Sequence, residues 1–398
     1  MNVPKQKLRL LTIFPSNQRG GTEEYALKIA TAAVEQGWEV HVAFPKRETT
    51  ASLVQSFEEK GVIYHPFEIP EIDTPEFKTL KTYVVYLTRT IGLLLKNKPN
   101  VVHVNLPWFK YCFASIIACG LLKVPTAVIF HLIPEYVAFN SKKLRVYAWA
   151  RSRGQQWIGV SEHNRKVVSE TFQIPQDQVL CIYNGSKVVS NASNFTQEEI
   201  TTVRHQLRQE LSLPAKSRLA LTVGRLSVQK GHTDLIRAIP PLVKEFPDMR
   251  FIWVGEGEER ENLVNKVREY GIEDKVLFLG YRSDVPKLLV AADLFIFPTQ
   301  FEGQPFAIIE AMAYGLPIVT SNACGIPELI EDKVHGLLFR KGDSCELLEA
   351  TSWALRHPEQ MQEMAKRAKL RVQEFSEEKM VKKTLSALHK LTHALPEI

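Results

Sequence analysis

Residues 218–231 read RLALTVGRLSVQKG, an apolar run followed by a loop that carries two cations and ends in glycine. The apolar run predicts a β-strand over 218–224, and the pattern from Asp234 onward predicts a helix. Arg225 and Lys230 then follow the carboxyl end of a strand, where two cations can clamp a pyrophosphate. The plainer alternative is a surface loop with two basic residues, but the strand-end position favours phosphate binding.

The same alternation of strand and helix runs along the whole chain. Besides 218–224, short apolar or β-branched runs predict strands at 8–14, 39–44, 100–104, 126–130, 156–160, 250–254, 275–279, 293–297 and 316–320. A helical pattern over 22–36 separates the first two of these strands. This order predicts an α/β protein, with parallel sheets wrapped by helices.

A polar stretch from Lys187 to Glu199 interrupts the alternation and predicts a linker. With 398 residues, two domains are the natural expectation. We therefore expect two Rossmann-like, doubly wound α/β domains, over residues 1–190 and 200–375, facing one another across a cleft. Ligands of such sheets bind beyond the carboxyl ends of the strands, so the cleft is the expected site.

The composition is that of an ordinary globular protein, with 45% hydrophobic and 24% charged residues. The polar first residues lead directly into a predicted strand, so we expect no signal peptide. The longest apolar stretch, residues 111–122, is too short to span a bilayer. The five scattered cysteines lack C-x-x-C spacing, which predicts reduced thiols, a cytoplasmic location and no zinc site.

Basic residues are concentrated in the first half of the chain. Residues 78–153 hold twelve Lys or Arg against a single acid, Glu135. Aromatic residues are interleaved with them, among them Tyr83, Tyr86, Trp108, Phe109, Tyr111 and Phe113. A basic surface with exposed aromatics attracts anionic lipid headgroups, and the absence of a recognised nucleic-acid module favours a membrane surface over nucleic acid. The alternative is a solvated rim of lysines around helices whose aromatics belong to the core.

Residues 301–310 read FEGQPFAIIE and follow the predicted strand 293–297. This spacing predicts one carboxylate, Glu302, on a loop and a second, Glu310, on the helix that follows. Backbone N–H groups at the start of such a helix can hold an anion, and the glutamates can bind hydroxyls. Two ordinary surface glutamates are the alternative.

Three further loops are candidates for ligand contact. Residues 254–260 read VGEGEER, so Arg260 replaces the third glycine of G-x-G-x-x-G; the motif fails as a nicotinamide signature but leaves Gly255 able to contact a nucleotide. Gly21, in a glycine pair before the helix 22–36, could hold an oxyanion or simply turn the chain. His131 directly follows the strand 126–130, as a catalyst or as a satisfied hydrogen-bonding residue. No D-x-D occurs, so a pyrophosphate would be neutralised by Arg225, Lys230 and helix N-termini without a carboxylate-bound metal.

Together these residues resemble the retaining, nucleotide-sugar-dependent glycosyltransferases of family 4, which have the GT-B fold. The matching motifs, in the order of the family, are Gly20-Gly21, Asn184-Gly185, the G-R-L-x-x-x-K-G of residues 224–231, the V-x-F-L-G of residues 276–280, the E-x7-E of Glu302 and Glu310, and the G-x-P-E-L of residues 325–329. Each motif is weak alone, but six in this order are highly specific.

The resemblance implies a role for each matched residue. Arg225 and Lys230 would grip the donor diphosphate, Glu310 would hold the ribose, and Glu302 would contact the transferred sugar. His131 would support the transition state from the acceptor domain. The remaining implied contacts to the donor are Gly21, Gly255, Leu279 beside the base, and Gly303, Phe306 and Ala307 on the phosphate-binding loop. Pro305 replaces a glycine that many members have, which removes a backbone donor.

The resemblance also implies the type of reaction and the course of the last helix. Residues 376–398 should cross back onto the first domain. We expect a metal-independent hexosyltransferase without a cofactor, with UDP-glucose as donor and GDP-mannose second. The acceptor would be a saccharide or lipid-linked saccharide of a cell-surface polysaccharide or glycolipid, at the inner face of the plasma membrane. A nucleotide-sugar epimerase of the same fold and a non-enzymatic, membrane-docked nucleotide-sugar sensor are the alternatives.

Overall fold

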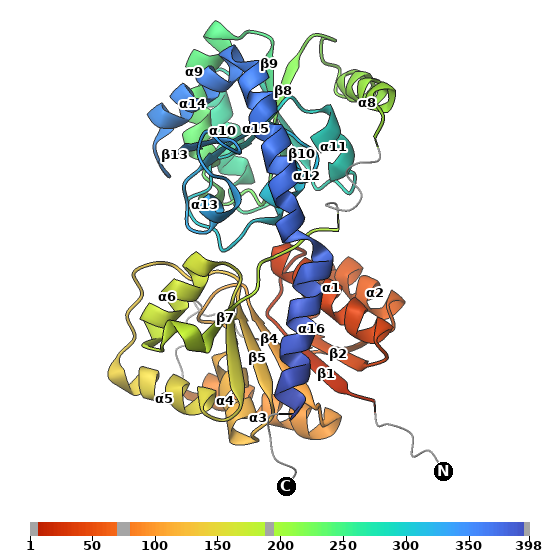
Figure 1. Ribbon diagram of the computed structural model, residues 1–398, viewed down its shortest axis with the longest axis vertical. Coiled ribbons are helices and arrows are strands. Elements are labelled where there is room, and N and C mark those ends of the chain that lie inside the picture. Colours follow the sequence, from red (N-terminus) through yellow and green to blue (C-terminus); the bar gives the residue numbers. More distant parts are fainter. Residues whose placement is uncertain (1–6, 70–79, 188–194, 394–398) are drawn as a thin grey trace. The chain divides into compact units, whose positions relative to one another are not determined.

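The computed structural model describes residues 7–69, 80–187 and 195–393, in two compact units (Figure 1). The first unit holds the chain up to Asn184 together with Glu378 onward, and the second holds Gly185–Glu377. Much of the linker expected at 187–199 and the start of the basic segment fall at residues 188–194 and 78–79, which lie outside the described residues.

The first unit is built on a seven-stranded parallel sheet in the order β3-β2-β1-β4-β5-β6-β7. Its strands are β1 (Arg9–Ile13), β2 (Glu39–Phe44), β3 (Ile63–Pro66), β4 (Val101–Leu106), β5 (Thr126–Phe130), β6 (Gln155–Gly159) and β7 (Val179–Cys181). Its helices are α1 (Gly21–Glu35), α2 (Ala51–Glu59), α3 (Leu80–Asn97), α4 (Phe113–Leu121), α5 (Ser141–Arg151), α6 (Glu162–Phe172) and α16 (Glu377–His393). The helices cover both faces of the sheet, as in a doubly wound fold (Figure 1).

The second unit repeats this plan with a six-stranded parallel sheet in the order β10-β9-β8-β11-β12-β13. Its strands are β8 (Arg218–Val223), β9 (Met249–Val254), β10 (Val276–Gly280), β11 (Leu294–Phe297), β12 (Ile318–Ser321) and β13 (Leu337–Phe339). Its helices are α8 (Gln197–Glu210), α9 (His232–Glu245), α10 (Arg260–Glu269), α11 (Val285–Ala291), α12 (Phe306–Ala313), α13 (Ile326–Leu329), α14 (Ser344–Arg356) and α15 (Pro358–Arg371). Both sheets therefore have the strand order of a Rossmann-like fold, which confirms the predicted fold class.

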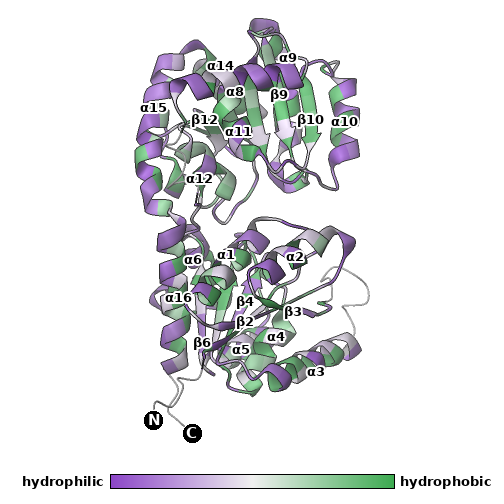
Figure 2. Ribbon diagram, turned by 90° about the vertical axis from the view of Figure 1, so that its right-hand side faces the viewer, coloured by the Kyte–Doolittle hydropathy of each residue, from purple (hydrophilic) through white to green (hydrophobic). Residues whose placement is uncertain are grey.

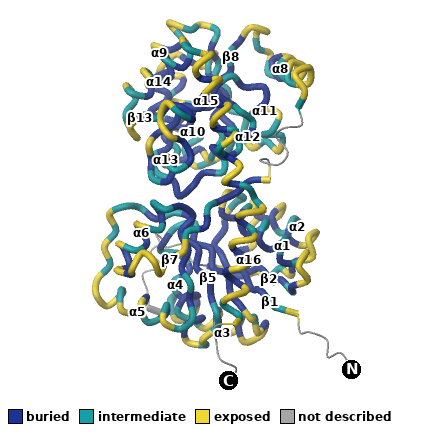
Figure 3. The backbone as a smooth tube through the Cα atoms, in the orientation of Figure 1, coloured by how far each residue is buried: buried dark blue, intermediate teal, exposed yellow. Residues whose placement is uncertain are grey.

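The central strands form the core of each unit because their apolar side chains are covered on both faces. All six residues of β4 are buried, and Figure 3 shows β4 and β5 in the buried centre of the first unit. In the second unit, β9 and β10 stand out as hydrophobic elements between more polar helices (Figure 2). An aromatic cluster closes one side of the first core, where Trp157 packs edge-on against Phe172 at 4.8 Å.

Most of the aromatics named in the basic segment lie in or against the core of the first unit and not on an exposed aromatic surface. Tyr86 and Phe109 are buried, and Trp108, Tyr111 and Phe113 pack against the core of the first unit. Tyr83 is half-buried, and its ring contacts that of Phe113 at 5.9 Å. The described cations of the segment are largely exposed, including Lys96, Lys123 and Lys142. These aromatics therefore mostly serve the core, and the large apolar residues exposed among the described ones of this segment are Val84, Val85, Leu95, Leu121, Tyr136 and Val146.

The chain enters and leaves the second unit through two adjacent segments. Ser186 N–H donates to the carbonyl of Phe375 at 3.2 Å, and Ser186 pairs with Ser376 in a parallel bridge. A Cβ on Gly185 would overlap the carbonyl of Ser376, so this crossing requires glycine. The helix α16 then packs in the first unit, where Thr384 contacts Tyr25. No described helix is long and apolar enough to span a membrane.

Candidate active site

Each sheet has one topological switch point, where the connections on either side lead away to opposite faces. It lies between β8 and β11 in the second sheet and between β1 and β4 in the first. Ligands of doubly wound sheets bind outside the carboxyl ends of the strands at such a point. The loops after β8 and β11 carry Arg225, Lys230 and Glu302, so the structure brings the predicted donor residues to this position.

Lys230 and Glu302 are in direct contact. The Lys230 ammonium forms an ion pair with Glu302 Oε1, and their side chains are only 16% and 10% exposed. Thr299 Oγ1 donates to the same carboxylate oxygen at 3.0 Å, and the ammonium lies 4.9 Å from the centre of the Phe297 ring. A largely buried ion pair is tolerated when further hydrogen bonds satisfy its partners. The charge of the Lys230 ammonium is therefore compensated by Glu302.

The loop geometry that makes this contact depends on Gly231. Its φ is +69°, and a Cβ at this position would overlap the carbonyl oxygen of Pro298. The two loops are also joined by backbone bonds, since Gln300 N–H donates to the carbonyl of Gln229 at 2.7 Å. The side-chain amide of Gln229 in turn donates to the carbonyl of Phe301 at 2.8 Å. These contacts fix the two loops that carry Lys230 and Glu302 against one another.

The loops after β8, β9 and β10 are joined in the same way. Gly224 N–H donates to the carbonyl of Val254 at 2.9 Å, and Gly255 N–H donates to that of Gly280 at 2.8 Å. Gly255 has a φ of +136°, and a Cβ there would overlap the carbonyl of Gly224. Leu279 lies on β10, immediately before Gly280. The structure thus brings Gly255 and Leu279 to the same edge of the sheet as the β8 loop.

Arg225 differs from Lys230 in being accessible. Its side chain is 51% exposed, and Arg225 Nε lies 3.5 Å from a carboxylate oxygen of Glu258, which is itself 60% exposed. An ion pair this exposed contributes little to stability. Arg225 can therefore turn toward a bound anion at low energetic cost.

The helix α12 presents its N-terminus to this edge of the sheet. It begins at Phe306, with Ala307 in its first turn, and Pro305 holds the N-cap position with φ −76°. A proline fits this position because its fixed φ suits the entry to a helix. The first-turn N–H groups come after Pro305, so the proline leaves the anion-binding end of the helix in place. Gly303 is buried in the loop before it.

Glu310 lies one turn further along α12 and is partly buried. Ser186 Oγ donates to Glu310 Oε1 at 3.4 Å, so Glu310 contacts the segment at which the chain enters the second unit. The two glutamates of E-x7-E therefore have different surroundings: Glu302 pairs with Lys230, and Glu310 with a neutral hydroxyl.

In the first unit, His131 is 9% exposed and directly follows β5. Its Nε2 lies 3.1 Å from Asn105 Oδ1, and the Tyr25 ring packs edge-on against it at 4.8 Å. Burial, and then the neighbouring His103, lower the pKa of His131 to about 3. The imidazole is therefore neutral at physiological pH. Gly21 is the first residue of α1, the helix that also carries Tyr25.

Sequence reasoning missed Asn105, Tyr25 and Thr299. Asn105 was detectable, because it is a polar residue near the carboxyl end of the otherwise apolar run VVHVNL. Tyr25 reads only as part of the apolar face of a helix. Thr299 gives no local signal, since its role depends on where the following loop places Glu302.

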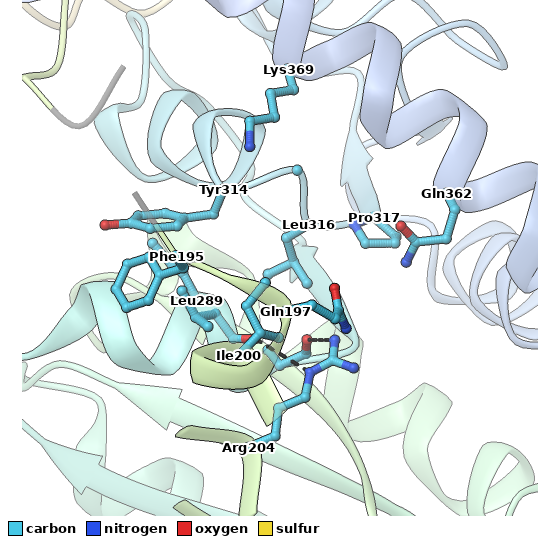
Figure 4. Close-up of a pocket in the computed structure, with 13 residues that line it drawn as sticks. Phe195, Gln197, Ile200, Arg204, Leu289, Tyr314, Leu316, Pro317, Gln362 and Lys369 are labelled. Carbon is cyan, nitrogen blue, oxygen red and sulfur yellow. Dashed lines mark hydrogen bonds between the residues drawn. The ribbon is translucent and has the colours of Figure 1, made fainter. Parts of the chain in front are cut away.

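A separate pocket of about 370 Å³ lies at the opposite edge of the second sheet (Figure 4). It is lined by Phe195, Arg204, Tyr314, Pro317 and Lys369, among others, and residues 314–317 precede the amino end of β12. The Arg204 guanidinium donates to the carbonyls of Val290 and Ala292 at 3.4 and 3.3 Å. None of the motif residues lines this pocket, so it is not the candidate donor site.

Two family models match the chain and together span most of it. Residues 19–187 match Glycosyltransferase Family 4, and residues 203–371 match Glycosyl transferases group 1. The second match contains Arg225, Lys230, Glu302 and Glu310. The first contains His131, Asn105 and Tyr25.

Curated relatives and solved structures agree with these matches. An uncharacterized glycosyltransferase of Haemophilus influenzae is 26% identical over 91% of this chain and 94% of its own length. The UDP-Gal:alpha-D-GlcNAc-diphosphoundecaprenol alpha-1,3-galactosyltransferase of Escherichia coli is 28% identical over 65% of this chain and 67% of its own. The crystal structure of Anabaena HepE in complex with UDP-glucose superposes with a TM-score of 0.78 at 24% identity, covering 96% of this chain and all of HepE. The chain therefore belongs to the group 1 glycosyltransferases of family 4 and has their GT-B fold.

Proposed function

We propose that this glycosyltransferase moves glucose from UDP-glucose, with retention at the anomeric carbon, onto a saccharide or lipid-linked acceptor. The observation that carries the proposal is the Lys230–Glu302 pair beside the accessible Arg225, at the switch point of the second sheet. One carboxylate and two cations within two joined loops suit a ligand that has both sugar hydroxyls and a diphosphate.

The chemistry requires stabilisation of charge on the leaving group. The bond between the anomeric carbon and the diphosphate oxygen breaks, and a bond from that carbon to the acceptor oxygen forms. The acceptor proton passes to the leaving diphosphate. Arg225, Lys230 and the first turn of α12 would stabilise the diphosphate, each donor contributing up to about 10²–10³ in rate. Because these groups supply the positive charge, we propose that the reaction needs no metal.

Glu302 would act on the sugar side of the same site. A donor phosphate that binds Lys230 competes with Glu302 for the ammonium, and this frees the carboxylate to accept a hydrogen bond from a sugar hydroxyl. Glu310 would bind the ribose hydroxyls in place of the Ser186 hydroxyl. His131, held neutral by burial, would act as a hydrogen-bonding group toward the sugar rather than as a cation.

UDP-glucose is the favoured donor because two lines of similarity point to uridine. HepE is described in complex with UDP and glucose and with UDP-glucose, and the Escherichia coli relative uses UDP-Gal. GDP-mannose is the second candidate donor. The diphosphoundecaprenol acceptor named for the Escherichia coli relative supports a lipid-linked acceptor.

Incubation of the protein with labelled UDP-glucose and a diphospholipid-linked saccharide tests the proposal. We expect transfer of label that persists in EDTA and is lost in Lys230→Ala. Interconversion of the free donor without transfer would identify an epimerase instead. Binding of the donor without any turnover, with or without acceptor, would identify a sensor.

A lipid-linked acceptor would place the protein at the inner face of a membrane. The exposed cations of α3 to α5, with Val84, Leu121 and Tyr136 exposed among them, would dock on anionic headgroups. We expect sedimentation with vesicles of 30% phosphatidylserine at low salt and release at about 0.5 M NaCl, because salt screens exposed charges. Failure to bind these vesicles at any salt concentration would exclude electrostatic docking.

A further inference from the structure

A continuous set of buried polar side chains surrounds His131 in the first unit. Asn105 Nδ2 lies 3.3 Å from His103 Nδ1, and Asn105 Oδ1 lies 3.1 Å from His131 Nε2. The Tyr25 hydroxyl lies 3.0 Å from Thr384 Oγ1 on α16, and the Tyr25 ring contacts His131. Asn105, His103, Tyr25 and Thr384 are fully buried, whereas His131 is 9% exposed. His131 is thus the member of the set that reaches the surface.

Hydrogen-bond donors and acceptors in this set fix the tautomer of His131. An amide oxygen only accepts, so Asn105 Oδ1 takes its hydrogen from His131 Nε2–H. The amide nitrogen only donates, which assigns it to His103 Nδ1. Burial lowers the pKa of both imidazoles to about 3, so each carries a single proton. His131 therefore keeps its proton on Nε2 and offers Nδ1 as an acceptor for a hydroxyl.

The Tyr25 ring also packs against the imidazole ring of His131. The two rings meet at an angle of 74°, which restricts rotation of His131. Burial raises the pKa of Tyr25, so the phenol stays protonated and can donate to Thr384. Through this bond the last helix of the chain is in contact with the ring that packs on His131.

We propose that Asn105, Tyr25 and Thr384 are positioning residues that hold His131 in one neutral tautomer and one orientation. The proposal rests on the role of His131 under the proposed function. It assigns α16 a second task besides completing the core: through Thr384 and Tyr25 it fixes the orientation of His131.

The tautomer can be observed directly in protein labelled with ¹⁵N-histidine. Two-bond ¹H–¹⁵N spectra, with His131 assigned from the His131→Gln variant, should show one neutral form protonated on Nε2. Asn105→Asp retains an oxygen acceptor and should keep the proton on Nε2. Asn105→Leu should release a mixture of tautomers and lower kcat about tenfold, the upper range for one lost hydrogen bond, with KM for the donor unchanged. An unaltered His131 spectrum in Asn105→Leu would overturn the proposal.

The hydroxyl pair is tested by shape-conserving changes. Tyr25→Phe and Thr384→Val each remove one partner of the same bond, so each should lower kcat several-fold and broaden or shift the His131 signals. The double variant should be no worse than either single change. Thr392→Val is the matched control, because the Thr392 hydroxyl donates to the His389 carbonyl of its own helix, at 2.7 Å, and to no other described residue. Equal losses of kcat in Thr384→Val and Thr392→Val would show that the effect comes from the general stability of the helix, and this would reject the proposal.

These measurements separate the two hypotheses. If the wild type transfers sugar but Asn105→Leu changes neither tautomer nor kcat, positioning fails and the proposed function stands. If no donor is turned over while Asn105→Leu alters the tautomer, the proposed function fails and the network stands as a structural feature.

Discussion

At the residue scale, substitutions of Lys230 and Arg225 should separate effects on catalysis from effects on the stability of the fold. Lys230→Ala leaves the Glu302 carboxylate largely buried without its cation, which we expect to cost about 3 kcal/mol. Arg225→Ala breaks an exposed ion pair with Glu258 and should cost less than about 1 kcal/mol. Both should lower kcat/KM by about 10²–10³, because both cations stabilise the leaving group. Urea unfolding and transfer assays on the two variants provide the measurement.

The matched double variant checks the cause of that instability. Lys230→Ala with Glu302→Ala removes both charges, so it should be more stable than Lys230→Ala alone while remaining inactive. Equal unfolding free energies for Lys230→Ala and Arg225→Ala would contradict the burial of the ion pair as the source of the difference.

His232 offers a second prediction at this scale, from its burial without polar partners. Among the described residues neither ring nitrogen has a hydrogen bond, and the ring packs edge-on against Trp253 at 4.9 Å. Burial, and then the charge of Lys230, lower its pKa to about 3. Because the unfolded form, with a pKa near 6.5, binds the proton and the folded form does not, stability falls as pH drops from about 6.5 toward 3.

The substitution His232→Phe should remove the contribution of this histidine to the pH dependence of stability. His232→Phe keeps the edge-on contact with Trp253 and should stabilise the protein by about 1–2 kcal/mol at pH 7. Below pH 6 the unfolding free energy of the wild type should also fall more steeply with decreasing pH than that of the variant. The two slopes should differ by about 1.4 kcal/mol per pH unit. Chemical unfolding between pH 4.5 and 7.5 measures both, and parallel pH curves for wild type and variant would refute the buried neutral histidine.

At the scale of elements, the loop between β8 and α9 depends on Gly231. Alanine there would require a left-handed φ of +69° and would overlap the Pro298 carbonyl, so the loop must move and carry Lys230 with it. Gly271→Ala is the control in the same unit, since Gly271 has φ +62° and nothing within 4 Å of the added Cβ. We expect Gly271→Ala to cost about 1 kcal/mol with normal transfer. Gly231→Ala should cost more and abolish transfer; normal transfer in Gly231→Ala would contradict the role of the loop.

The elements also show how far the sequence predicts the structure. The ten predicted strands are all present, because their apolar runs can be recognised without any distant partner. The strands β3, β7 and β13 were missed: each has three or four residues and depends on pairing with a neighbouring strand. The geometry of the candidate site also depends on contacts between segments that are distant in the sequence. The loop motifs place Arg225 and Lys230 correctly, whereas the contact of Lys230 with Glu302 joins loops 72 residues apart.

At the scale of the whole molecule, the donor should bind through the second unit, and heat stability should report it. A ligand that binds only the folded form adds RT ln(1 + [L]/Kd), about 2.7 kcal/mol at 100 times Kd. For units of this size that corresponds to a rise in Tm of roughly 5–10 °C. We expect UDP-glucose to give the largest rise, GDP-mannose a smaller one and ADP-glucose none.

Substitutions in the candidate donor site test whether the rise in Tm comes from binding at that site. Arg225→Ala and Lys230→Ala should lose most of the rise, because both contacts go to the diphosphate that all nucleotide sugars share. Asn105→Leu, which alters the first unit, should keep the full rise even where its kcat is reduced. A larger rise with GDP-mannose than with UDP-glucose would replace the proposed donor. A rise that survives in Lys230→Ala would place the nucleotide elsewhere than at the switch point of the second sheet.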